Sequence, residues 1–519
     1  MNGDLCIYGG TAAGVIAAVT AAKLGRTVLL VEPSRHLGGM TTGGLGFTDI
    51  GNKLAIGGLS REFYRRVGKV YGKEESWVFE PSVAEKVLHE LIAEANAGGE
   101  KIKVLLNHRI EEVDARDALI RRIMLARASN ADATIVEEHI PAEAASFIDC
   151  TYEGDLMALA KVQFTFGREA VAQYDEPLNG IRPNTPKHQF LVPVDPYVKS
   201  GDRSSGLLPL IQEGDGGTPG AGDQRVQTYN LRLCLSKDKS NQNPITPPEG
   251  YDPATYEILA RHLEGLVDAK KPINLGMLLK IDLMPNNKTD INNNGAVSTD
   301  YIGHSWTYPS ADFATRHRIW QEHVAYTHGL LHFLATSPRV PASVRKEMAV
   351  WGLTKDEFQE TGGWPHQLYV REARRMIGRY VVTQHDCEHK TSVDDSIGLA
   401  AYNMDSHNCQ RIVQNGVVRN EGDVQVAPAA PYSISYRAIT PKAEVCRNLL
   451  VPVCLSASHI AYGSIRMEPV FMLLGQSAAM AAHMSLEKRA NVQDVDIPAL
   501  QARLLTDGQI LKWTAPVKK

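Results

Sequence analysis

The sequence predicts an α/β protein, and three observations support this fold class. A short apolar run, Leu5–Tyr8, leads into a glycine turn and an alanine-rich segment over Val15–Leu24. A second apolar run, Thr27–Val31, completes a strand–helix–strand unit within about 30 residues. Further along, Ser82–Ala97 has apolar residues at helical spacing and is followed by several strand-like runs. Strands that alternate with helices in this way favour a parallel sheet covered by helices.

The first unit has the spacing of a Rossmann-like, dinucleotide-binding fold. Gly9 permits a tight turn and Gly14 lets the helix approach the strand, while the helix N-terminus offers N–H groups to a pyrophosphate. Glu32 ends the second strand, where a carboxylate can accept hydrogen bonds from ribose hydroxyls. Thr11 stands in place of the middle glycine of the GxGxxG pattern, so a ligand there has to tolerate a side chain. A glycine-rich turn without a cofactor is the alternative.

The segment Arg35–Gly46 indicates a flavin rather than a nicotinamide. It contains five glycines, and glycine lets a flat ring lie against the backbone because no Cβ blocks it. The segment resembles the flavin-contacting stretch of glutathione-reductase-type FAD domains. It holds no cysteine pair, which excludes a disulfide reductase. The chain has no second strand-linked glycine pattern, so a built-in NAD(P)H domain is not expected.

A β-meander is expected after the helix at Ser82–Ala97, which begins beside Pro81. The strand-like runs are Ile102–Leu106, Arg109–Val113, Ala118–Leu125, Thr134–Glu138 and Ala145–Ile148. The last run leads into a turn that we expect near the cofactor phosphates. Asp149 and Asp155 in this turn are candidates for binding the cofactor, and structural capping is an equal alternative.

The rest of the chain suggests a split domain. Residues 1–165 and 361–519 are expected to form the FAD-binding domain in two parts. Residues 166–360, in which Pro, Asn and Gly become frequent, predict an inserted, mixed α+β substrate domain. In the last part, Leu449–Leu455 predicts a strand, and a helix is expected to begin near Pro469. The N-terminus of that helix, aimed at the flavin pyrimidine, would stabilise the negative charge that builds there on reduction.

Six motifs spread over nearly the whole chain resemble a single family. They are YGGTAAG (8–14), GGMTTGGLG (38–46), DCTYEGDLMA (149–158), YVREARRMIGRY (369–380), YSISYRAITPK (432–442) and SASHIAYGSIRMEPVFMLLGQSAA (456–479). They are similar to the FAD-dependent oxidoreductases that are sometimes labelled as xanthan lyases. The resemblance implies bound FAD, an inserted substrate domain and no nicotinamide site. It does not indicate one reaction, and nothing in these residues supports the lyase label.

The candidate cofactor-binding residues come from the segments described above. They are Gly9, Gly10, Thr11, Ala12, Ala13, Gly14, Glu32, Arg35, Gly39, Met40, Thr41, Thr42, Gly43, Gly44, Asp149, Gly154, Asp155, Gly463, Ser464, Ile465 and Glu468.

Imidazoles and guanidiniums near these segments are the candidate catalytic groups, because hydride transfer to flavin N5 needs a base and a clamp for the substrate. His459 lies just before the expected turn at 463–468, and His407 has a carboxylate close by in the sequence. Arg371 and Arg466 are candidates for holding a carboxylate or a polyol. The alternatives are hydrogen-bonded structural histidines and pairing of neighbouring Glu and Arg side chains along a helix.

No metal site is expected. His385–His389 places donor side chains close together but continues into no known ligand pattern. Asp290–Gly295 imitates the start of a calcium loop, yet Tyr301 stands at the twelfth position, where a bidentate Glu is needed. Asn292–Asn294 in this stretch suit hydrogen bonding to substrate hydroxyls, and a polar surface loop is the alternative.

Charge and cysteine content exclude several partners. Lys and Arg number 55 against 59 Asp and Glu, a net charge of −4, so a nucleic-acid or anionic-membrane partner is not expected. The seven cysteines form no CxxC pair, which argues against a disulfide scaffold or a zinc ribbon. The first residues lack a signal-peptide pattern, and Val470–Leu486 is too short and polar to span a bilayer. We therefore expect a soluble, cytoplasmic protein, although a leader already removed would leave the same appearance.

The function that we expect is FAD-dependent oxidation of a small polar substrate, hydroxylated and sugar-like, by hydride transfer to flavin N5. His407 or His459 would remove the proton, and Arg371 or Arg466 would bind the substrate. Oxygen, a quinone or a protein would reoxidise the flavin. The alternatives are a fumarate-reductase-like reduction of an activated double bond and, in another class, a non-redox flavoprotein or polysaccharide lyase.

Overall fold

The main sheet of the computed structural model, which describes residues 1–129, 135–183, 185 and 187–515, has the order β3-β2-β1-β6-β5-β4, with β22 beside β6. Its strands are β1 (Asn2–Tyr8), β2 (Val28–Glu32), β3 (Ile102–Leu106), β4 (His108–Arg116), β5 (Leu119–Ala128), β6 (Val136–Asp149) and β22 (Leu449–Leu450). Strands β3, β2, β1, β6 and β22 are parallel, whereas β4, β5 and β6 form an antiparallel meander. The α/β class and the Rossmann-like fold are confirmed.

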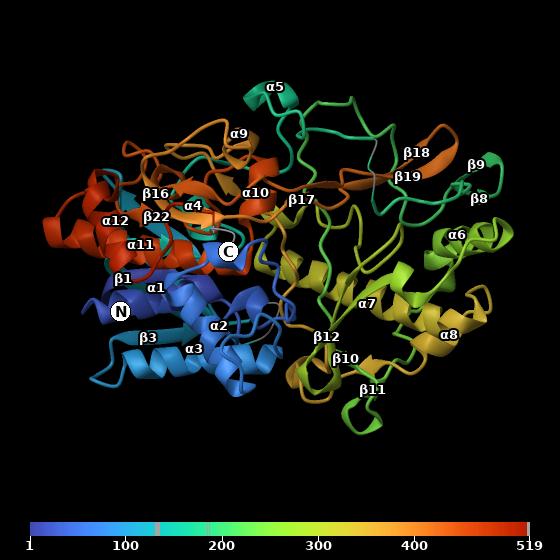
Figure 1. Ribbon diagram of the computed structural model, residues 1–519, viewed down its shortest axis with the longest axis horizontal. Helices are drawn as coiled ribbons and strands as arrows, with labels where there is room; N and C mark the ends of the chain where they lie inside the picture. Colours follow the sequence, from blue (N-terminus) through green and yellow to red (C-terminus); the bar gives the residue numbers. More distant parts are fainter. Residues whose placement is uncertain (130–134, 184, 186, 516–519) are drawn as a thin grey trace.

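The parallel part of the sheet is buried on both faces. Along β1, Leu5 and Ile7 pack into one apolar cluster, while Cys6 and Tyr8 pack into a second cluster with the meander. The two-residue period of a strand therefore divides one apolar run between two cores. Four helices that pack into the first cluster lie together in Figure 1: α1 (Ala12–Lys23), α2 (Gly58–Val70), α3 (Pro81–Ala95) and α11 (Glu468–Lys488).

Strand β6 corrects one prediction. The runs expected as two strands, Thr134–Glu138 and Ala145–Ile148, belong to a single strand from Val136 to Asp149, and Thr134 lies outside the described residues. The first half of β6 pairs with β5 in the meander, and the second half pairs with β1 and β22. Side chains from Ile140 to Glu143 alternate between buried and exposed, which explains why the apolar pattern breaks in mid-strand.

The C-terminal elements differ from the predicted ones in two places. The strand expected over Leu449–Leu455 is only two residues long, and Pro452, which lacks an N–H group, follows it closely. The expected turn before the last long helix is largely a helix of its own, α10 (His459–Ile465). Its cap is Ser458, whose hydroxyl accepts a hydrogen bond from the N–H of Ala461 at 3.2 Å. The long helix α11 begins beside Pro469, as expected.

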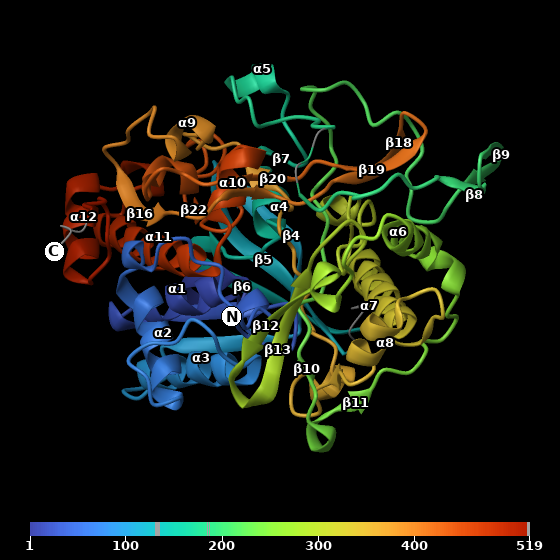
Figure 2. The same cartoon turned by 45° about the vertical axis from the view of Figure 1, so that its right-hand side comes forward.

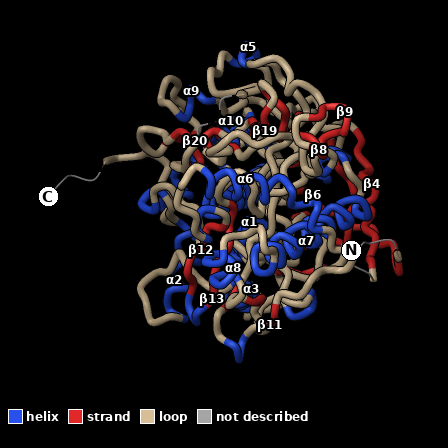
Figure 3. The backbone as a smooth tube through the Cα atoms, turned by 90° about the vertical axis from the view of Figure 1, so that its right-hand side faces the viewer, coloured by secondary structure: helices blue, strands red, loops and turns tan. Residues whose placement is uncertain are grey.

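The middle segment forms a second layer of sheet and helices. Its five-stranded sheet has the order β11-β14-β10-β13-β12 and stands beside α7 in Figure 2. The strands are β10 (Leu235–Ser236), β11 (Asn243–Pro244), β12 (Leu279–Met284), β13 (Lys288–Asn293) and β14 (Gly352–Leu353). The helices are α6 (Glu257–Asp268), α7 (Phe313–Thr336) and α8 (Ala342–Met348), which face the viewer in Figure 3.

Five two-stranded ribbons and several short helices complete the chain. The ribbons pair β7 (Phe164–Thr165) with β15 (Arg375–Met376), β8 (Tyr197–Lys199) with β9 (Asp202–Leu207), β16 (Ser396–Ala400) with β21 (Tyr432–Ser435), β17 (Met404–Ser406) with β20 (Val424–Val426) and β18 (Gln410–Gln414) with β19 (Val417–Glu421). The short helices are α4 (Asp155–Leu159), α5 (Val171–Tyr174), α9 (Gln384–Cys387) and α12 (Ile497–Thr506). Among the described helices, none is long and apolar enough to cross a membrane.

The ribbon of β18 and β19, in the last third of the chain, contacts the middle segment. The N–H of Val418 in β19 donates to the carbonyl of Val194 at 3.0 Å, and the N–H of Gln212 donates to the carbonyl of Arg411 in β18 at 2.8 Å. Figure 1 shows this ribbon, in orange, among the green elements. Hydrogen bonds therefore join the last third of the chain directly to the middle segment.

Candidate functional site

Gly9 and Gly14 shape the turn after β1. Gly9 has a φ of +101°, and a Cβ atom there would lie 2.6 Å from the carbonyl carbon of Cys150. A Cβ atom at Gly14 would lie 1.9 Å from the carbonyl oxygen of Gly9. Only glycine therefore lets α1 come this close to β1.

Thr11 explains the departure from the glycine pattern. It is the N-cap of α1, and its hydroxyl accepts a hydrogen bond from the N–H of Gly14 at 3.3 Å and donates one to the carbonyl of Cys150 at 2.8 Å. Its φ of −58° suits any L residue. The N–H groups of Ala12 and Ala13, in the first turn of α1, have no acceptor within the helix and are free to bind an anion.

Glu32 is the last residue of β2 and Arg35 follows the strand, and both line a cavity at the ends of β1 and β2. The Glu32 carboxylate accepts hydrogen bonds from the N–H groups of Gly10 at 2.7 Å and Ser34 at 2.8 Å. Burial raises the pKa of Glu32. The Arg35 guanidinium reaches the carbonyl of Ser129 at 3.4 Å.

The cavity at the ends of β1 and β2 has a volume of about 380 Å³, within the usual range for small-molecule sites. Its residues on the sheet side include Gly9, Thr11, Glu32, Ser34, Arg35, His36, Gly39, Asn107, Thr151, Tyr152, Glu153 and Asp155. Tyr308 and the side chains of α7 form another wall. A glycine turn, a helix N-terminus and a strand-end carboxylate meet here, so these residues fit a dinucleotide such as FAD.

The glycines of the segment after β2 are packed against protein. A Cβ atom at Gly43 would lie 2.3 Å from Cβ of Gln367, and one at Gly44 would lie 2.2 Å from the carbonyl oxygen of Arg232. A Cβ atom at Gly39 would lie 2.4 Å from the Tyr152 hydroxyl. Our expectation that these glycines let a flavin ring lie against the backbone stays a prediction, and Gly39 does line the cavity. The glycines are small at these places because other segments of the chain lie against them.

Glu468 joins the glycine-rich segment to the N-terminus of α11. Its carboxylate accepts hydrogen bonds from the Thr41 hydroxyl at 2.6 Å and the Tyr152 hydroxyl at 2.8 Å. The same Tyr152 oxygen accepts a hydrogen bond from the N–H of Met40 at 2.9 Å. Burial raises the pKa of Glu468 to about 7. The structure thus brings together two sequence-predicted segments that are far apart in the chain.

The other predicted residues around α10 and the glycine segment contact protein. The Ser464 hydroxyl donates to the carbonyl of Tyr402 at 2.6 Å, and a Cβ atom at Gly463 would lie 2.6 Å from the carbonyl oxygen of Asp405. Ile465 is fully buried. The Thr42 hydroxyl donates to the carbonyl of Leu37 at 2.6 Å. Gly463, Ser464 and Ile465 therefore hold α10 in place and are absent from the lining of the cavity at the ends of β1 and β2.

Asp149 and Asp155 have different contacts. Asp149 is fully buried and accepts hydrogen bonds from the N–H groups of Thr151 at 3.0 Å and Met157 at 2.9 Å, as a structural cap does. Asp155 lines the cavity and pairs with Arg316 of α7 at 2.6 Å. Gly154, with a φ of +70°, is the N-cap residue of α4.

His407 lies in a cluster of ion pairs, and two aspartates face its ring nitrogens. Nδ1 is 2.9 Å from Oδ2 of Asp300, and Nε2 is 3.4 Å from Oδ2 of Asp405. Arg371 lies 3.0 Å from Asp300, and Arg466 lies 2.6 Å from Asp405. The structure thus brings together three of the four predicted catalytic residues.

The electrostatics of this cluster favour a charged imidazole. Burial and Arg371 act to lower the pKa of His407, but Asp300 and Asp405 outweigh them and raise it. Burial acts to raise the pKa of Asp405, but His407 and Arg466 lower it to about 2. Burial also acts to raise the pKa of Asp300, but Arg371 and His407 lower it, so both aspartates are ionised at neutral pH.

Asp49 connects the His407 cluster to the glycine-rich segment, which ends three residues before it. Its carboxylate accepts hydrogen bonds from the hydroxyls of Tyr369 at 3.3 Å and Tyr402 at 3.1 Å. The guanidiniums of Arg232 and Arg371 lie 5.1 and 5.0 Å from the centroid of the Tyr369 ring. The cluster therefore lies where the glycine segment, the 369–371 segment and the start of α11 converge.

Asp423 is a member of this cluster that sequence reasoning missed. Ser406 of β17 pairs with Val424 of β20, and the N–H of Cys409 donates to the carbonyl of Glu421 at 2.7 Å. The same register places Asp423 across from His407, on the same face of the ribbon. Burial raises the pKa of Asp423 to about 7.

The ring of His188 lies parallel to the imidazole ring of His407. The two rings stack, with centroids 6.3 Å apart and planes 10° apart. Burial, with the positive His407 nearby, lowers the pKa of His188 to about 4. Neither His188 nor Asp423 belongs to a motif, and only their distance in space links them to His407.

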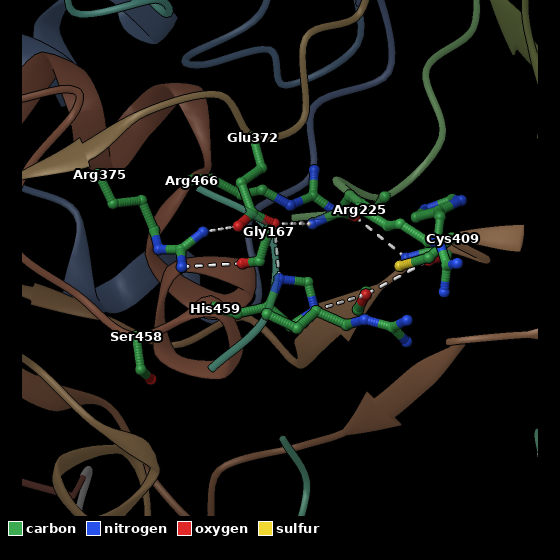
Figure 4. Close-up of polar contacts among 12 residues, drawn as sticks. Gly167, Arg225, Glu372, Arg375, Cys409, Ser458, His459 and Arg466 are labelled. Atoms are coloured by element: carbon green, nitrogen blue, oxygen red, sulfur yellow. Dashed lines mark hydrogen bonds and ion pairs between the residues drawn. The ribbon is translucent and has the colours of Figure 1, made fainter. Parts of the chain in front are cut away.

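His459, the fourth predicted catalytic residue, is enclosed by protein. Nδ1 lies 2.7 Å from the Glu372 carboxylate, and Nε2 lies 2.9 Å from the Ser406 hydroxyl. Figure 4 shows this ring between its neighbours, with Glu372 also paired to Arg375. The side chain is 1% exposed, and burial lowers its pKa to about 3. His459 is therefore a neutral residue that supports the strand before His407.

The segments weighed for metal binding have other contacts. Within the described residues, the His, Cys, Asp and Glu side chains form no group that could hold a metal ion. Asp290 pairs with Arg232 through two contacts of 2.7 Å. The Asn292 side chain accepts a hydrogen bond from Asn230 at 2.9 Å, and Asn294 donates to the carbonyl of Gly276 at 2.6 Å.

Comparison with known proteins supports the cofactor. Residues 4–504 match the family model described as FAD dependent oxidoreductase. No curated protein matches the chain.

Solved structures match only part of the chain. L-Proline dehydrogenase from P. horikoshii is 18% identical with a TM-score of 0.19, over 33% of this chain and 25% of its own. p-Nitrophenol 4-monooxygenase from Pseudomonas putida is 13% identical with a TM-score of 0.24, over 32% and 45%. Thioredoxin reductase from T. acidophilum is 16% identical with a TM-score of 0.18, over 28% and 34%. The chain thus spans less than half the length of these structures, and the family match carries the assignment.

Proposed function

Because this chain belongs to the FAD-dependent oxidoreductase family, we propose that it oxidises a small, polar, hydroxylated substrate of sugar-like character. Bound FAD would supply the acceptor for a hydride at its N5 atom. The single observation that carries the proposal is the His407 cluster, which lies against the glycine-rich segment and the start of α11. The substrate carbon would lose a hydride, and its hydroxyl proton would pass to a base on the protein.

His407 is the base in this proposal. Asp300 at 2.9 Å holds Nδ1, which leaves Nε2 with the longer contact of 3.4 Å to Asp405. His407 acts in its deprotonated form, whose share grows as the pH rises through the raised pKa of this residue. In that form Asp300 holds Nδ1–H, and Nε2 is the proton acceptor. Arg371 and Arg466 neutralise the two aspartates, so they position the base and do not clamp the substrate.

The charges of the cluster favour an uncharged substrate. Arg371 pairs with Asp300, Arg466 with Asp405, and Arg232 with Asp290. No guanidinium of these three lacks a carboxylate partner, so a substrate carboxylate would compete with an internal one. Hydroxyl groups bring no such competition, which supports a polyol or sugar over a hydroxy acid.

Anaerobic flavin reduction tests the proposal. We expect polyols or sugars to bleach the flavin of the purified protein, and the matching sugar acids to do so less. We expect His407→Gln to slow this reduction by about 10²–10⁴-fold, the usual contribution of a general base, while FAD stays bound. His389→Gln is the control, because His389 bonds to the carbonyl of Ala430 away from the cluster. Reduction of His407→Gln at the wild-type rate would remove His407 as the base.

The same screen tests the reaction class. Flavin that no hydroxylated compound reduces, in a protein that retains FAD, would contradict the proposed substrate class. Elimination of a polysaccharide by protein carrying a non-reducible FAD analogue would support a lyase instead.

A further inference from the structure

One face of α7 lines the cavity at the ends of β1 and β2. Phe313, Arg316, His317 and Trp320 all line it, and they are spaced i, i+3, i+4 and i+7. This spacing places the four side chains on one face of a helix. The helix belongs to the middle segment, which we expected to bind substrate.

Two stacked ring pairs line this cavity. His36, which follows β2, stacks on His366 with ring centroids 4.0 Å apart and planes 12° apart. His317 stacks on Trp320 with centroids 5.6 Å apart and planes 17° apart. The Trp320 indole N–H donates to the carbonyl of Pro365 at 2.9 Å, which ties α7 to the segment carrying His366.

An ion pair beside the cavity holds α7 in position. Arg316 makes two hydrogen bonds to the carboxylate of Asp155, at 2.6 and 2.9 Å. Asp155 is the first residue of α4 and is largely buried. A two-pronged guanidinium–carboxylate contact fixes orientation as well as distance. The α7 face is therefore held rigidly over the cavity.

We propose that this face of α7 completes the site for the adenosine half of FAD, with the adenine ring held by Trp320 and the His36–His366 pair. The Glu32–His36 end of the cavity is the adenosine end, because an acidic residue after the second strand contacts the ribose in this fold. Aromatic side chains bind a base through its flat face. The middle segment thus binds cofactor as well as substrate.

Binding of ADP to the full chain stripped of FAD tests this proposal by calorimetry, with FMN as the comparison ligand. We expect Trp320→Ala to weaken ADP and FAD binding by about 10-fold or more and to leave FMN binding unchanged. Trp513→Ala is the control, because Trp513 lines a different cavity beside α12. Wild-type affinity of Trp320→Ala for ADP would overturn the proposal, as would equal losses for ADP and FMN.

Trp320→Phe keeps an aromatic ring if the alanine variant does not fold. We expect this variant to bind ADP with nearly wild-type affinity. ADP should quench the tryptophan fluorescence of the wild type and of Trp513→Ala, but much less that of Trp320→Phe. Undiminished quenching in Trp320→Phe would show that Trp320 does not contact the base.

Discussion

At the scale of single residues, the different contacts of His407 and His459 give these two histidines different pKa values. His407 has carboxylates at both ring nitrogens, which raise its pKa, and β17 and β20 hold it beside Asp423. His459 is enclosed between Glu372 and a hydroxyl, and burial lowers its pKa to about 3. His407 therefore stays charged to a higher pH than a free histidine, whereas His459 is neutral at neutral pH.

The raised pKa of His407 predicts a pH-dependent contribution to stability. A group with a higher pKa in the folded state stabilises the protein fully below its unfolded pKa, about 6.5 for histidine. This contribution is lost as the pH rises through the raised, folded value. We therefore expect His407→Gln to lower the free energy of unfolding most at about pH 6 and below, which is about half a pH unit under the pKa of histidine in the unfolded chain. At alkaline pH we expect a smaller loss.

Urea denaturation of wild type and variant over a series of pH values measures this difference. His389→Gln provides the matched control, and we expect it to change stability little at every pH. A His407→Gln deficit that is the same in acid and alkali would contradict the ion pairs of His407 with Asp300 and Asp405.

At the scale of elements, the junction of β1 and α1 depends on Gly14. A Cβ atom at this position would lie 1.9 Å from the carbonyl oxygen of Gly9. The helix would have to move away from the strand, and its first N–H groups would move away from the cavity with it. Thr11, by contrast, faces the turn and caps the helix.

We expect Gly14→Ala to cost about 1–3 kcal/mol of folding free energy, as overpacking does, and to release FAD on purification. Thermal melting and the visible absorption of the purified variant measure the two effects. Gly98→Ala is the matched control, because nothing lies within 4 Å of a Cβ atom there. A Gly14→Ala variant that keeps its FAD and its melting temperature would contradict the close approach.

At the scale of the whole molecule, the Asp155–Arg316 pair joins the two layers. Arg374 also contacts Asp155 at 2.6 Å, and the Tyr308 hydroxyl donates to the Glu153 carboxylate at 2.9 Å. These side chains come from segments on both sides of the cavity. The cavity at the ends of β1 and β2 is therefore closed by contacts that neither layer supplies by itself.

We expect Arg316→Met to release FAD faster and to lower the free energy of unfolding by about 3 kcal/mol, the lower end for a broken buried ion pair, because Arg374 still contacts Asp155. The rise of free-FAD fluorescence after dilution measures the release. Arg339→Met is the control, since Arg339 pairs with Glu257 and Glu264 within the middle segment. Equal rates of FAD release in the two variants would show that the Asp155–Arg316 ion pair does not retain FAD.

The sequence by itself determined the cofactor part of the protein. The strand, glycine turn, helix and acidic strand end lie within one local unit, and their spacing is dictated by backbone geometry. The resemblance of six motifs added the family, which the match over residues 4–504 shows. The positions of Gly14 and Glu32 could be read in this way because they act through Gly9 and Gly10 of the same local unit, whereas the close contact of Gly9 with Cys150 depends on the fold.

Only the tertiary structure decided which polar side chains meet. Asp300, Asp423 and His188 reach His407 from separate segments, and no spacing in the sequence relates them. For the same reason, the sequence did not predict that α7 lines the cavity, although the residues that do so, from Phe313 to Trp320, have the i, i+3, i+4, i+7 spacing of one helix face. Burial and ion pairing set the charge of a histidine, and both depend on neighbours that folding brings in from distant parts of the chain.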